Sequence, residues 1–275
     1  MKFKKKPGKY NDYIQIFLLN FLLAVLSFLP LLLKGKGIFL LCNDFNAQQI
    51  PFHMLANDAL KSGNVFWNRS IDLGSNFVGS LGFYVLGSPF AWLSFLFPAS
   101  WYPYVTGWLY MGKYAMAAMT AYGYIKRFKK KKYAAISATL YAFSGFQAVN
   151  LIFHHFHDAV AFFPLLLIGY EKLIREGKKG MLAAGVCINA LVNYYFFIQE
   201  VIFLVLYFLC REGTRLWKNR RLVWHCFAEG ILGTGMAGIL FVPDIWFTLY
   251  NPRISRLLPA ENWFYKGNRD YLQVF

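Results

Sequence analysis

Charged residues are scarce in this 275-residue chain, at 15% of the total, and the 13 acidic residues are far fewer than the 29 basic ones. Soluble globular domains carry about 25% charged residues. Here 57% of the residues are hydrophobic and 20% are aromatic, and the mean hydropathy is +0.37. The composition therefore excludes an ordinary soluble domain and predicts a protein that crosses a membrane several times.

Several motifs that would indicate other functions are also missing from the sequence. The four cysteines lie far apart and form neither a CxxC pair nor a Cys/His cluster, so nothing indicates a disulfide framework or a zinc site. Glycine-rich phosphate loops, Ser/His/Asp sets and nucleotide fingerprints are absent, which argues against an enzyme driven by ATP or a nucleotide sugar. The formal charge of +16 lies in short clusters away from any nucleic-acid-binding motif, so we expect no nucleic acid partner.

Long apolar runs, in contrast, are abundant. Most approach the ~20 residues that are needed to cross ~30 Å of hydrocarbon as a helix. We expect about seven spans, at residues 13–33, 101–124, 133–152, 158–174, 181–197, 198–210 and 222–243. The fifth and sixth are close together, with their turn near Gln199 and Glu200. The predicted fold class is an all-α polytopic membrane protein.

The basic residues predict the orientation of these spans. Most of them lie in segments 1–12, 125–132, 171–180 and 211–221, which the positive-inside rule places in the cytoplasm, whereas most acidic residues fall on the other side. We therefore expect one transmembrane domain over 1–275 in a bacterial plasma membrane. It consists of a cytoplasmic tail (1–12), a first span (13–33), an extracytoplasmic loop (34–100), the remaining spans (101–243) and an outer segment (244–275).

The loop 34–100 is the segment in which we expect the functional site, because long ordered loops are usually functional. Pro51 begins a run of apolar residues at spacings of three and four that ends at Gly63, which predicts a short amphipathic helix on the membrane surface. Residues 83–98 are apolar but short and broken by Gly87 and Pro89. This pattern favours an interfacial or re-entrant segment.

Asp44 is the acidic residue of most interest in this loop, since it lies just before the predicted helix, at the exit of the first span. A carboxylate at this position could act as a general base or orient a nucleophile. A helix N-cap or a solvated loop acid is an equally good interpretation.

Further candidates lie elsewhere on the expected outer side. A leaving phosphate needs cationic or hydrogen-bonding groups, and the sequence offers them in FHHFHD and NPRISR, as His154, His155, His157, Arg253 and Arg256. Adjacent histidines on one short turn rarely bind a single zinc ion, so an interfacial turn is the preferred interpretation of the first motif. Asp158 either caps the helix that it begins or serves as a second acid.

Three ionisable residues fall within predicted spans, namely Lys113, His225 and Glu229. Such residues are functional candidates by default. Lys113 could line a cavity for a lipid phosphate, or it could pair with another helix.

Several residues of the loop also resemble a known family. The first extracytoplasmic loop of the YfhO family of bacterial membrane proteins is similar to the set formed by Asp44, Gln48, Pro51, Phe52, Gly63, Trp67, Gly74, Asn76, Tyr84 and Ser88-Pro89-Phe90. Spans of that family are similar to Pro164-Leu165-Leu166 with Gly169, and to Asn193-Tyr194-Tyr195-Phe196. YfhO proteins are considerably longer, so we expect this chain to be an N-terminal fragment or a truncated paralogue.

The resemblance implies a GT-C-like helical bundle whose large first outer loop carries short interfacial helices. It also implies a glycosyltransferase that moves a sugar from a polyprenyl-phosphate carrier to a cell-envelope acceptor such as lipoteichoic acid, with Asp44 as the catalytic base. Gln48, Trp67, Asn76 and Tyr84 are then candidates for contacts with the acceptor or the sugar. The expected partners are the lipid-linked sugar, the envelope polymer and the lipid bilayer.

Two other functions fit the same pattern. One is a transporter or flippase of a lipid-linked envelope intermediate, and the other is a non-catalytic, truncated paralogue. No cofactor is predicted with certainty, and a divalent metal ion remains an option for which the sequence assigns no ligands.

Overall fold

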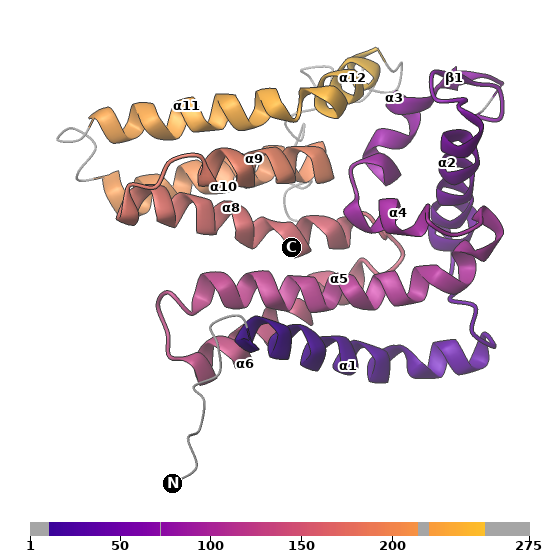
Figure 1. Cartoon of the computed structure of the whole chain (residues 1–275), viewed down its shortest axis with the longest axis horizontal. Coiled ribbons are helices and arrows are strands. Elements are labelled where there is room, and N and C mark those ends of the chain that lie inside the picture. The colour runs from indigo at the N-terminus through magenta and orange to yellow at the C-terminus, as the bar shows by residue number, and fades with distance from the viewer. Residues whose placement is uncertain (1–10, 72, 214–219, 251–275) are drawn as a thin grey trace, which may run out of the picture.

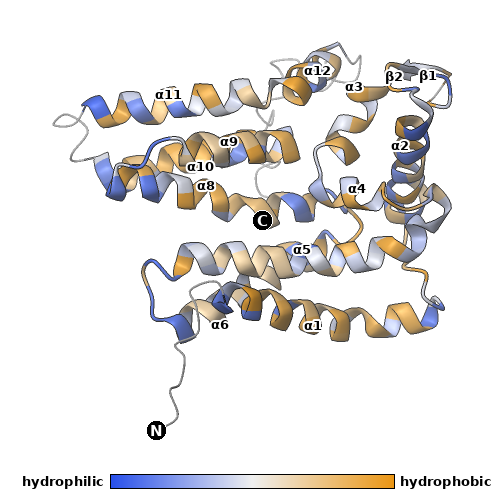
Figure 2. Ribbon diagram, viewed as in Figure 1, coloured by the Kyte–Doolittle hydropathy of each residue, from blue (hydrophilic) through white to orange (hydrophobic). Residues whose placement is uncertain are grey.

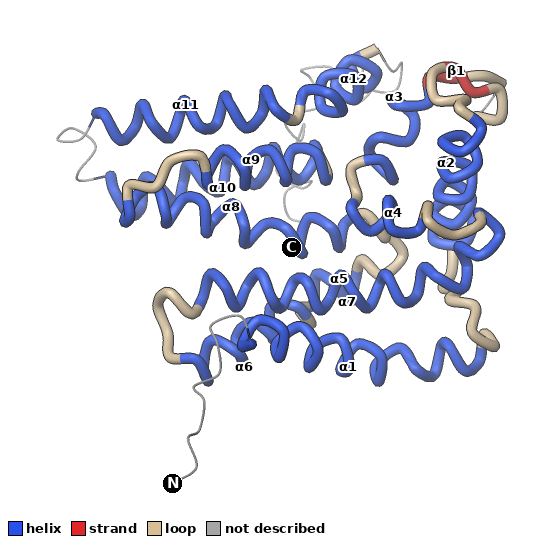
Figure 3. The backbone as a smooth tube through the Cα atoms, viewed as in Figure 1, coloured by secondary structure: helices blue, strands red, loops and turns tan. Residues whose placement is uncertain are grey.

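The structure is a computed structural model that describes residues 11–71, 73–213 and 220–250 (Figure 1). The regular elements of these residues are nearly all helices, which confirms the predicted all-α class (Figure 3). The elements follow in the order α1 (Asn11–Lys34), η1 (Phe45–Gln49), α2 (Ile50–Ser62), β1 (Trp67–Asn68), β2 (Ser75–Asn76), α3 (Phe77–Leu81), η2 (Gly82–Leu86), α4 (Pro89–Ser94), η3 (Ala99–Trp101), α5 (Tyr102–Ile125), α6 (Lys131–Ala142), α7 (Gly145–Val149), α8 (Phe156–Glu176), α9 (Met181–Val192), α10 (Tyr194–Glu212), α11 (Arg220–Met236) and α12 (Gly238–Leu249).

The long helices lie side by side in a row. Helix α5 packs against α1, α6 and α8, while α9 packs between α8 and α11 (Figure 1). The segment between α1 and α5, which we call the insert (residues 35–101), lies at one end of the long helices. Helix α2 runs across the direction of α1 and α5, and a short antiparallel pairing of β1 with β2 closes the hairpin that follows it.

The other end of the long helices carries basic loops. The α5–α6 and α8–α9 connections lie there, and Figure 2 shows hydrophilic residues at the helix ends that flank them. An ion pair between Arg127 and Glu176 at 3.0 Å joins the α5–α6 connection to the end of α8, and Arg175 pairs with Glu171 within α8 at 2.8 Å. The basic loops and the insert therefore lie at opposite ends of the helices.

Two helices of the described residues are long and apolar enough to cross a membrane, α1 with 24 residues and α10 with 19. A third span is added if α11 and α12, which meet at a bend of 79°, are counted together. Helices α5 and α8 are also long, at 24 and 21 residues. However, α5 is rich in tyrosine and glycine, and α8 carries several charged residues. The predicted number of seven spans is not confirmed by this criterion.

The helices depart from the predicted spans at three places. The break expected near residues 197–200 lies at Asn193, whose side-chain oxygen accepts hydrogen bonds from the N–H groups of Tyr195 and Phe196 and so begins α10. The expected span 133–152 is divided into α6 and α7, and both are short. The expected span 222–243 is interrupted between α11 and α12, where Gly235 and Gly238 weaken the helix.

The predicted helix of the insert is confirmed as α2. Pro51 occupies its first turn, where its missing N–H costs nothing, and Gly63 ends it with a left-handed φ of 75°. The buried face follows the expected spacing through Ile50, His53 and Ala56. Near its C-terminus, Asn57 and Lys61 donate hydrogen bonds to the carbonyl oxygen of Phe97, which joins α2 to the last part of the insert.

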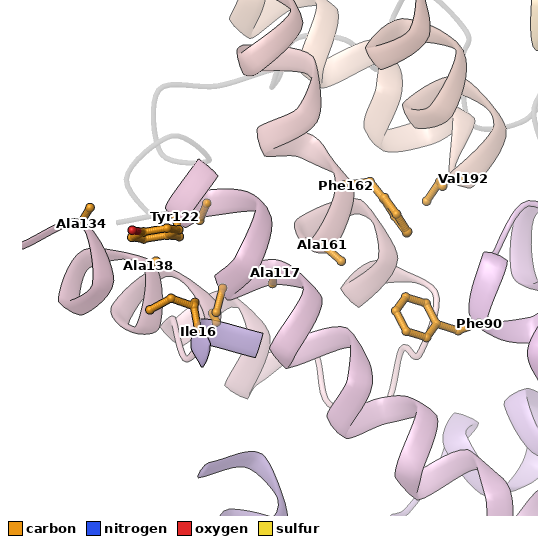
Figure 4. Close-up of a cluster of buried hydrophobic side chains, with 12 residues drawn as sticks. Ile16, Phe90, Ala117, Tyr122, Ala134, Ala138, Ala161, Phe162 and Val192 are labelled. Carbon is orange, nitrogen blue, oxygen red and sulfur yellow. The ribbon is translucent and has the colours of Figure 1, made fainter. Parts of the chain in front are cut away.

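One buried cluster contains side chains of both the bundle and the insert (Figure 4). The small side chains of Ala117 and Ala161 let α5 and α8 approach closely, as is common in membrane proteins. Phe90 of the insert packs on Phe162 of α8, with ring centroids 6.2 Å apart. The start of α8 and the insert thus share one core, and this core positions the site described next.

Candidate functional site

Asp44 lies on the surface of the insert, immediately before η1. It occupies the N-cap position of this turn, but its side chain forms no capping hydrogen bond there. The next residue, Phe45, is fully buried and packs its ring against Phe39 and Tyr110. An exposed carboxylate is therefore held next to a fixed aromatic residue.

An apolar recess of about 460 Å³ lies beside this segment. It is formed by the end of α1, the chain that follows it and the turn before α8, through Leu31, Lys34, Gly35, Ile38, Leu40, Leu41, Cys42, Leu151 and Ile152. Lys34 is the charged residue of this lining. Asp44 follows Cys42 by two residues, so their Cα atoms lie at most about 7.6 Å apart. The Cα atom of Asp44 therefore lies near the lining of the recess.

Behind Asp44, a buried polar cluster joins α5 to the start of α8. Lys113 Nζ lies 2.8 Å from Asp158 Oδ2, and it also contacts His154 through the ring Nδ1 at 2.7 Å and the carbonyl oxygen at 3.0 Å. All three side chains are essentially inaccessible to solvent. Lys113 thus pairs with a neighbouring helix, which is one of the two roles that the sequence left open. Asp158 is an ion-pair partner in this arrangement.

The predicted phosphate-binding histidines all lie in the interior. His155 Nδ1 is 3.2 Å from Gln49 Oε1, and His157 Nε2 is 2.6 Å from the hydroxyl of Tyr110. A fourth histidine, His53 of α2, joins them, because its ring contacts that of His154 with centroids 5.1 Å apart. Sequence reasoning missed His53, although its place on the apolar face of a predicted amphipathic helix was a signal.

Burial controls the protonation of the histidines that lie outside the expected spans. It lowers the pKa of His53 to about 3, against the opposing effect of a hydrogen bond to the carbonyl of Gln49. It also lowers the pKa values of His154 and His155 well below their usual range, and the positive charge of Lys113 acts in the same direction. These imidazoles are therefore neutral near pH 7.

The other predicted contacts of the insert are dispersed. Gln48 accepts a hydrogen bond from Gln49, and Trp67 is exposed on β1. Asn76 uses its side-chain oxygen to cap α3, by accepting from the N–H of Gly79 at 2.7 Å. Tyr84 packs against His155, with ring centroids 5.1 Å apart. Arg253 and Arg256 lie outside the described residues.

The two other ionisable residues of the predicted spans contact backbone groups. Glu229 of α11 accepts hydrogen bonds from the backbone N–H groups of Gly180, Leu182 and Ala183, at the start of α9. His225 contacts the carbonyl of Arg221, one helical turn away. Across residues 11–71, 73–213 and 220–250, no group of three or more His, Cys, Asp or Glu side chains is arranged to hold a metal ion.

Comparison with known proteins matches the chain to one family. A family model described as "Bacterial membrane protein YfhO" matches residues 15–273. The "Uncharacterized protein YfhO" of Bacillus subtilis (strain 168) is 28% identical over 234 residues, which are 75% of this chain and 26% of that protein. The chain thus spans about a quarter of the length of this relative. No solved structure matches the chain.

Proposed function

The chain belongs to the YfhO family of bacterial membrane proteins, and from this membership we propose that it contributes the donor site of a membrane glycosyltransferase. The reaction moves a sugar from a polyprenyl-phosphate carrier to a cell-envelope acceptor, such as lipoteichoic acid, on the extracytoplasmic side. Because the chain spans about a quarter of its relative, the complete activity is proposed for the whole protein. A GT-C-type fold is part of this proposal.

The observation that carries the proposal is the apolar recess beside an exposed carboxylate. A prenyl chain needs an apolar wall, and the recess offers one through Leu31, Ile38 and Leu151. The phosphate at the head of the carrier needs a cation, and Lys34 lies in the same lining. Asp44 stands at the rim, where an acceptor can arrive from water.

The chemistry assigned to Asp44 is general base catalysis. An acceptor hydroxyl attacks the anomeric carbon, and its proton passes to the Asp44 carboxylate. The bond between the anomeric carbon and the phosphate oxygen breaks, and the polyprenyl phosphate leaves as an anion. Lys34 stabilises that anion, and Arg253 and Arg256 remain candidates for the same role.

The buried histidines fit a supporting role better than direct phosphate contact. His154, His155 and His157 are all inaccessible, and one ring nitrogen of each contacts Lys113, Gln49 and Tyr110, respectively. We keep Gln48 and Tyr84 as candidates for contacts with the sugar, because both lie in the insert near η1. Trp67 and Asn76 belong to the hairpin and its junction with α3, where they are candidates for acceptor contact.

The test compares Asp44→Asn with Asp58→Asn in the full-length protein. Both residues are exposed carboxylates of the insert, but Asp58 is a residue of α2. Membranes that contain each variant are supplied with a radiolabelled polyprenyl-phosphate sugar, and incorporation into the envelope polymer is measured. We expect Asp44→Asn to abolish incorporation at normal protein level and membrane insertion, and Asp58→Asn to retain it. Retained incorporation in Asp44→Asn would remove Asp44 from the mechanism.

A transporter or flippase of the lipid-linked intermediate is the second candidate. The 79° bend between α11 and α12 favours it, because discontinuous helices are common at the substrate sites of transporters. Proteoliposomes separate the two functions. A glycosyltransferase consumes a carrier-linked sugar that is placed on the same face as Asp44, whereas a flippase moves it between leaflets without breaking the glycosidic bond.

A further inference from the structure

The π-helical turn η1, which begins directly after Asp44, is held by the buried cluster at both of its ends. At its start, the ring of Phe45 contacts that of His154, with centroids 6.4 Å apart. At its end, His53 Nδ1 donates to the carbonyl oxygen of Gln49 at 2.8 Å, and His155 Nδ1 lies 3.2 Å from the side-chain oxygen of the same residue. Single π-helical turns of this kind occur frequently at functional sites.

Lys113 determines how the His154 ring is oriented. An ammonium group has only protons to donate, so Nδ1 of His154 must accept at 2.7 Å and its proton must reside on Nε2. Lys113 also donates to the carbonyl oxygen of the same residue at 3.0 Å. The side chain and backbone of His154 are thereby fixed by one cation, whose charge is balanced by Asp158.

Such an arrangement is not explained by stability alone. Replacing a buried ion pair by apolar residues of similar volume is often neutral or stabilising, because the desolvation of two charges offsets their attraction. Both side chains here are completely inaccessible. An apolar pair would join α5 to α8 as well, but it would not orient the imidazole.

We propose that Lys113, Asp158 and His154 are positioning residues that hold the π-helical turn η1 and so set the place of the Asp44 carboxylate at the rim of the recess. They touch neither carrier nor acceptor. The catalytic part of this inference rests on the proposed glycosyl transfer. The structural part, that the cluster keeps η1 ordered, does not depend on it.

The test uses two variants of the full-length protein, Lys113→Met/Asp158→Leu and His154→Phe. The first removes both charges at similar volume. The second keeps a ring against Phe45 but removes the ring nitrogen that accepts from Lys113. Glu171→Gln is the matched control. Glu171 is also fully buried and ion-paired, with Arg175 and Arg211, but it lies 13 residues from Asp158 along α8, or roughly 20 Å.

Two measurements are made on each folded variant. Hydrogen–deuterium exchange of peptides covering residues 43–50 reports the order of η1, and sugar-transfer kinetics separate kcat from the KM for the carrier. We expect faster exchange of this segment in both test variants, a kcat that is lower by about 100-fold and a KM within about twofold of wild type, because a misplaced base slows chemistry more than binding. Glu171→Gln should change neither the exchange nor the kcat.

The outcomes distinguish this inference from the proposed function. Unchanged exchange of residues 43–50 in a folded test variant would overturn the positioning role, whatever the protein does. Faster exchange with retained transfer would overturn its catalytic part. If the double variant fails to insert, His154→Phe decides alone, since it leaves the ion pair in place. If Asp44→Asn retains transfer, the proposed function fails, while the exchange result still decides whether the cluster orders η1.

Discussion

The carboxylate of Asp244 on α12 fills the space that a side chain at Gly82 would need. A Cβ atom at residue 82 would collide with all three atoms of the Asp244 carboxylate group. Asp244 is buried in this position, and α12 also packs on α3. Helix α12, the second helix of the bent pair α11–α12, therefore packs closely against the insert.

Gly82→Ala should loosen this contact. Overpacking of a close interface typically costs about 1–3 kcal/mol, so we expect a lower unfolding midpoint in detergent and weaker protection of α12 in hydrogen exchange. Gly230→Ala is the control, because residue 230 is helical and a Cβ there meets nothing within 4 Å. Equal midpoints for the two variants would show that Asp244 and Gly82 can separate without cost.

Glu229→Gln should weaken the start of α9. The carboxylate accepts three backbone hydrogen bonds there, and its negative charge interacts favourably with the positive end of the helix dipole. The amide keeps one acceptor oxygen but loses the charge, so we expect a loss of about 1–2 kcal/mol. Thermal unfolding measures it. Glu176→Gln, which changes a half-exposed ion pair with Arg127, should change stability by less than about 1 kcal/mol.

Acidification should destabilise the protein through its buried histidines. The pKa values of His53, His154 and His155 are all lowered in the folded state, so the unfolded chain binds more protons below about pH 6.5. Stability is fully present above that pH and falls as the pH drops toward 3, by up to about 1.4 kcal/mol per pH unit for each histidine. Unfolding midpoints at pH 7.5, 6.5 and 5.5 measure the slope.

The variant for the pH experiment is His53→Gln. It removes one of the buried imidazoles and should flatten the pH dependence of stability. A wild-type slope in His53→Gln would contradict the assignment of His53 as a neutral buried group.

Gly63→Ala should destabilise α2 through its backbone alone. Gly63 adopts a φ of 75°, a left-handed value that costs a side chain about 1–2 kcal/mol, and a Cβ there would meet nothing within 4 Å. Gly63→Asn should be tolerated better, since asparagine adopts this conformation more readily. Circular dichroism during thermal unfolding compares the two. Identical stability would indicate that the end of α2 rearranges.

Features that depend on local chemistry were predictable from the sequence. The helix from Ile50 to Ser62 was found because proline and glycine mark its ends within thirteen residues. The break at Asn193 was not, because an apolar run continues on both sides and the signal is one side chain that caps the helix after it. The mean hydropathy of a window of residues does not report a single capping side chain.

The candidate site was predictable only in part. The sequence singled out Asp44, His154 and Asp158 one by one, but their relation to Lys113 depends on the packing of α5 against α8. That contact joins residues about 45 positions apart, which no local pattern reports. The burial of the histidines follows from the same packing, because the insert covers the turn that carries them.

The separation of Lys113 and Asp158 along the chain also matters while the protein is being made. A lone lysine at the centre of a helix costs about 2.5–3.5 kcal/mol on translocon-insertion scales. At about 5–20 residues per second, the ribosome needs roughly 2–9 s to add the 45 residues that bring the counter-charge. On the expected topology, in which α5 and α8 are spans, we therefore expect α5 to be retained at the translocon until α8 has been made, so that the two helices enter the lipid together.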